Sequence, residues 1–453
     1  MSPAERMIRS MNLFPRKSGN IIRDDNDVFV PGKIVEKKFS LLADASVEEL
    51  GHHAGYYSLP HTKAARMFYY FFENRNKSKD APVVIWLTGG PGCGSEVALF
   101  YENGPFKISQ NLSLEWNNYG WDKVSNLIYV DQPTGTGFSY SSDDSDLRHD
   151  EAGVSNDLYD FLQAFFKEYS QFANNDFYIT GESYAGHYIP ALASRIHQAN
   201  KQKQGILINL KGFVIGNGLT NPGIQYAAYT DFALANHLIT KKDFKDINTL
   251  LLPRCELFIK ICATQGGDLC ATAKIICGQV FQSILAAAGN NVNYYDIRKK
   301  CEGSLCYDFS NGEKLLNEKT VKKALGVSED LEYVSCSTTV YGAMERDFMV
   351  NLEVGIPALL EDGIRFLAYV GEEDLICNWL GNIRWVRAME WSGQKEFKEA
   401  PPVQFKVNGE EAGSLSSHGP LTFLKVYKAG HLVPMDQPEA ALDMLTRWIQ
   451  GKL

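Results

Sequence analysis

The sequence predicts an α/β protein with a doubly wound, mostly parallel sheet and an inserted, largely helical cap. Three observations lead to this class: short apolar runs, helical patterns between some of them, and a long stretch in which the strand signal fades. The apolar runs are residues 83–87, 127–131, 177–180, 213–216, 365–370 and 423–426. Parallel strands buried on both faces read as continuous apolar runs of this kind.

Helical patterns separate some of these strands. Residues 154–169 place Leu158, Phe161, Leu162 and Phe165 three and four positions apart, as on one face of a helix. Residues 187–199 follow a similar pattern. Strands that alternate with helices indicate a parallel sheet with helices packed on its faces.

The same signals divide the chain into four parts. Between residues 221 and 350, helix-like stretches, a cysteine cluster and polar loops replace the strands, which indicates an inserted cap. We therefore expect core segments at 31–220 and 351–453 on either side of the cap. Residues 1–30 are interpreted as a pro-segment, because a short helical pattern precedes a polar junction.

Composition is that of an ordinary folded protein. Of the 453 residues, 45% are hydrophobic and 22% are charged, so a large core can form. The formal net charge of −9 argues against a nucleic-acid binder, which needs a basic surface. The chain contains no uninterrupted run of 18 apolar residues, so we expect no membrane span.

The cysteines favour an oxidising compartment. Cys255, Cys262, Cys270 and Cys277 are spaced by 7, 8 and 7 residues, which suggests nested disulfides. A zinc site is the weaker alternative, because zinc sites more often show C-x2-C pairs, and this chain has none.

Targeting signals in the sequence do not decide the cellular compartment of the protein. Sequons at Asn76 and Asn111 predict glycosylation and agree weakly with a secretory protein. Residues 1–20 carry three arginines without the apolar core of a signal peptide. The protein is therefore expected either to be cytosolic or to have lost its signal.

A serine nucleophile is predicted at Ser183. The run GESYAG at 181–186 follows a predicted strand and precedes a helical pattern, which is the context of a nucleophile elbow. This sharp turn needs small residues beside the serine and presents its hydroxyl at the carboxyl edge of the sheet. A serine hydroxyl is a poor nucleophile, so it needs a base that is oriented by a carboxylate.

His431 and Asp374 are the predicted base and acid. In this fold the order along the chain is Ser, Asp, His, and each of the two residues follows a predicted strand, in the loop at its C-terminal end. His418 is also late enough, but its polar neighbours predict a solvated surface loop. Asp362 precedes its strand, so it lies at the wrong end of the sheet.

A glycine-rich run, TGGPGCGS at 88–95, follows the first buried strand. It could cradle a phosphate, but it lacks the lysine of a Walker loop. The alternative, which we favour, is that the glycines let backbone N–H groups approach a carbonyl oxygen. We predict an oxyanion hole formed by the amides of Gly90 and Tyr184.

Four motifs together resemble the serine carboxypeptidase family, with the plant vacuolar, type III-like branch nearest: WLTGGPGC at 86–93, GESYAG at 181–186, DLICNW at 374–379 and GHLVPMD at 430–436. The resemblance runs from about residue 28 to the C-terminus. It implies the α/β-hydrolase fold and hydrolysis of the last peptide bond of peptides and proteins with a free C-terminus. We expect no cofactor, metal or membrane partner, and leave a homodimer open.

The resemblance also implies a pocket for the substrate's free carboxylate, formed by Trp86, Thr88, Gly89, Glu102 and Glu182. Two close carboxylates cannot both ionise cheaply, so Glu102 and Glu182 should share a proton and donate it in a hydrogen bond. This predicts an acidic optimum and a vacuole-like, lysosome-like or extracellular location. Many relatives carry asparagine at Thr88, which leaves the strength of carboxylate binding open.

Disulfide pairs are implied by the same resemblance: Cys93 with Cys336, Cys255 with Cys277, Cys262 with Cys270, and Cys301 with Cys306. Cys377 remains free. In the family this cysteine lies near the catalytic histidine, which implies sensitivity to mercurials. A buried inert thiol is the alternative.

Two rival functions remain. Relatives with this fold transfer acyl groups from glucose esters, but they commonly carry aspartate where this chain has Glu182. A non-catalytic protective or binding partner is the second rival, and the intact triad argues against it.

Overall fold

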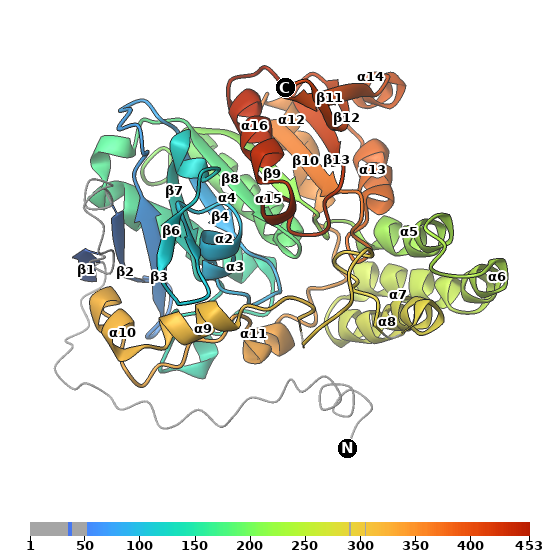
Figure 1. Ribbon diagram of the computed structural model, residues 1–453, viewed down its shortest axis with the longest axis horizontal. Helices are drawn as coiled ribbons and strands as arrows, with labels where there is room; N and C mark the ends of the chain where they lie inside the picture. The colour runs from blue at the N-terminus through green and yellow to red at the C-terminus, as the bar shows by residue number, and fades with distance from the viewer. Residues whose placement is uncertain (1–34, 39–51, 290, 304) are drawn as a thin grey trace.

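The computed structural model describes residues 35–38, 52–289, 291–303 and 305–453. The predicted pro-segment, 1–30, lies outside the described residues. An eleven-stranded sheet runs through the centre of the molecule and is flanked by helices (Figure 1).

The main sheet and a small hairpin account for the strands. The strands are β1 (Val35–Lys38), β2 (His52–Ser58), β3 (Arg66–Phe72), β4 (Val83–Leu87), β5 (Phe106–Ile108), β6 (Leu114–Trp116), β7 (Asn126–Val130), β8 (Phe177–Glu182), β9 (Leu210–Gly216), β10 (Arg365–Gly371), β11 (Val403–Val407), β12 (Glu410–His418) and β13 (Leu421–Val426).

Helices occupy most of the connections. They are α2 (Glu96–Tyr101), α3 (Glu151–Glu168), α4 (Ala185–Lys201), α5 (Pro222–Ala235), α6 (Lys241–Leu250), α7 (Leu252–Gln265), α8 (Asp268–Ala288), α9 (Ser310–Leu316), α10 (Lys319–Leu325), α11 (Thr338–Ala343), α12 (Ile356–Glu361), α13 (Trp379–Ala388), α14 (Gln394–Glu399), α15 (Val433–Asp436) and α16 (Pro438–Ile449).

The centre of the sheet is parallel. Its strands follow the order β1-β2-β3-β7-β4-β8-β9-β10-β13-β12-β11, and the strands from β7 to β13 in this order pair in parallel. These are the six strands predicted from apolar runs. The prediction of a mostly parallel α/β sheet is therefore confirmed.

The antiparallel edges of the sheet were not predicted. At one edge β1, β2 and β3 pair antiparallel, and at the other β11, β12 and β13 do so. His418 is the last residue of β12, so the prediction that it lies in a polar loop is wrong. An edge strand with one solvated face tolerates polar residues, which hides it from a search for apolar runs.

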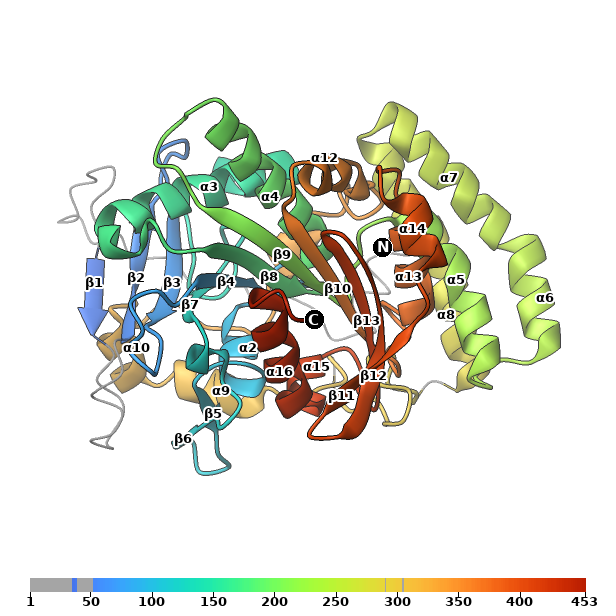
Figure 2. The same cartoon turned by 90° about the horizontal axis from the view of Figure 1, so that it is seen from above.

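Two apolar cores cover the two faces of the sheet. In β4, Val83, Ile85 and Leu87 point into a core shared with α3 and α4, whereas Val84 and Trp86 point into a core shared with α2 and α16. Figure 2 shows these helices on opposite sides of the sheet. Full burial of one such side chain contributes about 1.5–3 kcal/mol, so both faces hold the strand in register.

The predicted cap region contains helices and none of the main sheet's strands among the residues that the structure describes. Helices α5 to α8 gather at one end of the molecule, beside α13 (Figure 2). By length and composition alone α8 could cross a membrane, but two disulfides join it to α7 as a helical hairpin. The exact boundaries of the cap stay a prediction.

Candidate active site

Ser183 lies on the sharp turn between β8 and α4, as predicted. Its φ angle is 63°, in the left-handed region that residues other than glycine rarely adopt. Strand β4 packs closely beside the elbow, because a Cβ atom added to Gly181 would lie 2.1 Å from the carbonyl oxygen of Leu87. Backbone hydrogen bonds to Gly216 and Leu219 hold Ser183 on both sides. This is the strained geometry of a nucleophile elbow.

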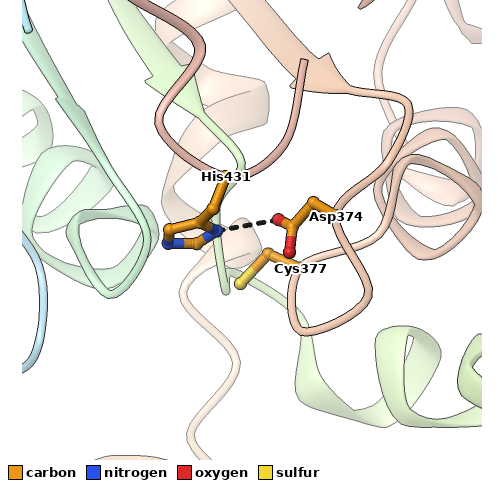
Figure 3. A group of neighbouring side chains, drawn as sticks. All are labelled: Asp374, Cys377 and His431. Carbon is orange, nitrogen blue, oxygen red and sulfur yellow. Dashed lines mark hydrogen bonds and ion pairs between the residues drawn. The ribbon is translucent and has the colours of Figure 1, made fainter. Parts of the chain in front are cut away.

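His431 and Asp374 form a buried pair. Nδ1 of His431 lies 2.8 Å from Oδ2 of Asp374, as Figure 3 shows, and the two residues follow β13 and β10 at the carboxyl edge of the sheet. If Nδ1–H donates to the carboxylate, Nε2 is left as the acceptor nitrogen. Nε2 is buried and has no hydrogen-bond partner among the described residues.

Ser183 is not hydrogen-bonded to His431 in this structure, but a short chain of contacts places both at one edge. The amide of Ser183 donates to the carbonyl of Gly216 at 3.0 Å, and the next residue, Asn217, donates from Nδ2 to Oδ2 of Asp374 at 2.8 Å. In enzymes without substrate such nucleophile–base bonds are often long and tighten in the complex.

The glycine-rich loop packs directly against the elbow. A Cβ atom added to Gly89 would lie 2.5 Å from the backbone nitrogen of Tyr184, so only glycine fits beside that amide. Neither Gly90 nor Tyr184 donates any of the backbone hydrogen bonds found in the turns and loops of the described residues. Both N–H groups are therefore suited to an oxyanion.

Glu102 and Glu182 form a buried carboxyl pair next to the nucleophile. Burial raises the pKa of Glu102 to about 8, against the opposing effect of its hydrogen bond with Glu182. Burial, followed by the charge of Glu102, raises the pKa of Glu182 well above its usual value. Apart from Glu182, no donor in the described part of the chain reaches the carboxyl oxygens of Glu102. The pair therefore retains a proton in mildly acidic solution.

Trp86 and Thr88 are joined by a hydrogen bond between their side chains. Nε1 of Trp86 donates to Oγ1 of Thr88 at 3.1 Å, and both side chains are buried. Because the threonine oxygen accepts this bond, its O–H remains a donor for a ligand. Threonine can thus supply one hydrogen-bond donor at this position.

Cys377 lies beside the histidine–aspartate pair (Figure 3). Asp374, Cys377 and His431 each offer a ligand atom within 4.8 Å of the others, so this group could hold a metal ion. Burial, and then the charge of Asp374, raises the pKa of the Cys377 thiol well above its usual value. The thiol is therefore protonated and a weak nucleophile at neutral pH, which favours the inert alternative.

Two residues of the site were missed by sequence reasoning. Asn217 holds Asp374 through its side chain, and its Oδ1 accepts from the amide of Gly371 at 3.1 Å. The ring of Tyr295 lies 4.9 Å from that of His431, and its carbonyl accepts from the amide of His431. A polar residue directly after a buried strand was a usable signal for Asn217, but Tyr295 had none.

The four disulfides form the same pairs that the resemblance implies, and Cys377 is free. The bond between Cys93 and Cys336 ties the oxyanion loop to the segment before α11. Asn76 and Asn111 are both exposed, which suits glycosylation, and their modification stays a prediction.

A serine on a strained elbow, a histidine–carboxylate pair and a glycine loop along one sheet edge define an α/β-hydrolase enzyme. Residues 44–451 match the serine carboxypeptidase family. The chain belongs to this family, and the expected fold and enzyme class are confirmed.

Similar proteins include plant and fungal members. The chain is 64% identical to serine carboxypeptidase-like 48 of Arabidopsis thaliana, over 99% of this chain and 89% of that protein. It is 61% identical to serine carboxypeptidase 3 of Hordeum vulgare, with the same coverage. A solved structure of a prohormone-processing carboxypeptidase from Saccharomyces cerevisiae superposes with a TM-score of 0.81 at 26% identity, covering 92% of this chain and 94% of that one.

Proposed function

We propose that the protein is a serine-type carboxypeptidase that removes single residues from the C-terminus of peptides and proteins at acidic pH. The observation that carries this proposal is the buried pair of Glu102 and Glu182, directly beside the nucleophile Ser183. A general α/β-hydrolase needs a triad and an oxyanion hole, whereas a proton held on paired carboxyl groups suits a substrate that carries its own carboxylate.

The residues suggest the following acyl transfer. Oγ of Ser183 attacks the last peptide carbonyl while Nε2 of His431 takes its proton, and Asp374 orients the imidazole through Nδ1. The amides of Gly90 and Tyr184 stabilise the oxyanion. When the C–N bond breaks, His431 returns the proton to the leaving amino acid, and an ester remains on Ser183. Water, activated by His431, then releases the shortened peptide.

Recognition of the C-terminus would depend on protonation. The shared proton of Glu102 and Glu182, the hydroxyl of Thr88 and the backbone at Gly89 can all donate to the substrate's carboxylate. As pH rises, the pair ionises and repels this carboxylate. Peptide cleavage should therefore decline as pH rises from mildly acidic values through about pH 8, mainly through a higher KM.

The proposed compartment is acidic and oxidising. Four disulfides and plant serine carboxypeptidase relatives are consistent with a secretory-pathway protein. An acidic optimum would suit a vacuole-like or lysosome-like destination.

The test is incubation with an N-blocked dipeptide between pH 4 and pH 8, with measurement of the released amino acid. We expect release from the parent, greatest at acidic pH, and none from Ser183→Ala. Ser145→Ala, at an exposed serine, is the matched control and should behave as the parent does. A parent that releases nothing at any pH would refute the proposal. Ester formation from a glucose ester and an alcohol, without peptide cleavage, would indicate acyl transfer instead.

A further inference from the structure

Tyr184 is held by its side chain as well as by the elbow. Its hydroxyl donates to Oδ2 of Asp347 at 2.8 Å, and its ring stacks on His187 with 4.6 Å between centroids. Tyr184 is 2% exposed and Asp347 4%, so water cannot easily replace this bond. Tyr184, whose amide is assigned to the oxyanion hole, is thus also held through its phenol hydroxyl.

Asp347 connects three parts of the chain at this point. It lies after α11, in the predicted cap, and contacts Tyr184 at the start of α4. Its Oδ1 accepts from the amide of Glu151, the first residue of α3, at 3.3 Å. The cap therefore reaches the oxyanion hole through one carboxylate and one phenol.

The carboxyl group of Glu151 has no charge-compensating partner in the described residues. Both of its oxygens are buried, and apart from Asp347 none of the described side chains pairs with them. Burial, and then the charge of Asp347, raises the pKa of Glu151 well above its usual value. Protonated Glu151 can donate to Asp347, whereas ionised Glu151 repels it.

The other titratable groups near this pair do not cancel the repulsion. Asp150, at the N-cap of α3, adds another negative charge. Burial lowers the pKa of His187, so this ring stays neutral near pH 7. Tyr184 and Tyr188 have pKa values raised well above the usual value, chiefly by burial, so they remain phenols.

Movement of the Tyr184 ring would reach the catalytic serine through His187 and Leu219. Nδ1 of His187, which stacks on that ring, lies 2.6 Å from the carbonyl oxygen of Leu219. The amide of Leu219 in turn donates to the carbonyl of Ser183 at 2.9 Å. A displacement of an oxyanion donor by a few tenths of an ångström weakens its hydrogen bond to the oxyanion. Greater mobility of the Tyr184 ring therefore slows catalysis, although the ring does not contact the substrate.

We propose that Asp347 is a positioning residue that fixes the oxyanion amide of Tyr184, and that Glu151 makes this positioning depend on pH. The inference rests on the proposed function, because it assigns Tyr184 to the oxyanion hole. It concerns the rate of acyl transfer, whereas Glu102 and Glu182 concern the binding of a free carboxylate.

An ester substrate separates these two effects. Hydrolysis of an N-blocked amino-acid ester requires Ser183 and the oxyanion hole but offers no carboxylate to Glu102 and Glu182. With this substrate we expect Tyr184→Phe to lower kcat about tenfold, less than loss of a direct oxyanion donor, with an unchanged KM. Asp347→Ala should have a similar effect, and Asp347→Asn, which keeps an acceptor for the phenol, should recover much of the loss at pH 5.

Glu151→Gln mimics the protonated carboxyl group at every pH. We expect the ratio of kcat at pH 8 to kcat at pH 5 to rise about threefold over that of the parent, because the amide donates to Asp347 without a proton to lose. Glu168→Gln, at an exposed position of the same helix, is the matched control and should leave the ratio unchanged. Identical pH profiles for parent and Glu151→Gln, or a Tyr184→Phe variant as fast as the parent, would overturn the proposal.

Thermal unfolding decides the same point without catalysis. The melting temperature of the parent should fall between pH 5 and pH 8 by more than that of Glu151→Gln, and an equal fall would also overturn the proposal. A parent that hydrolyses neither ester nor peptide refutes the proposed function, and the melting temperatures then still test the carboxyl pair.

Discussion

Asp374 and Glu102 are two carboxyl groups buried at the same edge of the sheet, and their surroundings differ in one respect. Oδ2 of Asp374 accepts from both His431 and Asn217. The carboxyl group of Glu102 has no partner in the described residues except another acid, Glu182. Donors stabilise a carboxylate, and a neighbouring acid stabilises a shared proton. For two carboxyl groups that are equally buried, the hydrogen-bond partners therefore decide whether the group orients a base or holds a proton.

Replacing Asp374, the carboxylate that accepts two hydrogen bonds, should have the largest effect on activity. Asp374→Asn keeps the shape of the side chain but allows the amide to donate to His431, which favours the wrong tautomer. We expect kcat for peptide cleavage to fall by about 10⁴-fold, as for similar triads. Asp362→Asn, outside the site, should match the parent. A loss of less than about tenfold would contradict the assignment of Asp374.

Removing one of the two hydrogen-bond donors to Asp374 should reduce activity less. Asn217→Ala deletes the 2.8 Å hydrogen bond to Oδ2 and the acceptor for Gly371. We expect kcat to fall about 10–100-fold, as is typical for groups that orient a catalytic residue through hydrogen bonds. Asn156→Ala, at an exposed asparagine on α3, is the control. An unchanged kcat in Asn217→Ala would show that His431 alone suffices to fix Asp374.

Removing the shared proton should change binding more than rate. In Glu102→Gln the amide can donate to Glu182 and favour its ionised form, which repels the substrate's carboxylate. We expect KM for an N-blocked dipeptide to rise about tenfold at pH 5, and less at pH 8, where Glu102 of the parent is itself about half ionised. KM for the dipeptide amide should not change, and a change in KM for both substrates would argue against a carboxylate subsite.

The same pair should make stability fall as pH rises. Because the pKa of Glu102 is raised to about 8 in the folded protein, its stabilising contribution is complete below its usual pKa of about 4.5 and is lost by about pH 8. We expect the free energy of unfolding of the parent to drop by about 4 kcal/mol over this window, and that of Glu102→Gln to drop less. Denaturant titrations at pH 4.5, 6 and 8 check this, and parallel declines in the two proteins would contradict it.

Pattern reasoning succeeded where one physical requirement dominates. β4 is buried on both faces, so every residue is apolar and the strand is visible in the sequence. Ser183 was found because a strained elbow needs small neighbours between a strand and a helix. Asp374 and His431 followed from their positions after β10 and β13, since parallel strands bring their carboxyl ends to one edge.

The remaining features depend on contacts that no local pattern encodes. Asn217 acts on Asp374, 157 positions later in the chain, and resembles an ordinary turn residue until the sheet is assembled. Glu102 and Glu182 were paired only through the family resemblance, because each alone reads as a solvated acid. The edge strands β11 and β12 carry exposed charges and have no continuous apolar run. These strands form because they pair with their neighbours in the sheet, which the sequence pattern does not show.

The disulfide between Cys93 and Cys336 has a consequence for where the protein can work. It lies three residues beyond Gly90, and two backbone hydrogen bonds flank it: the amide of Gly94 donates to Ser335, and that of Ser337 donates to Gly92. In a reducing cytosol this disulfide would not form, so the oxyanion loop would fold without it. We therefore expect newly made or mislocalised protein to be inert toward cellular peptides until oxidation completes the loop, a safeguard that activity before and after mild reduction would reveal.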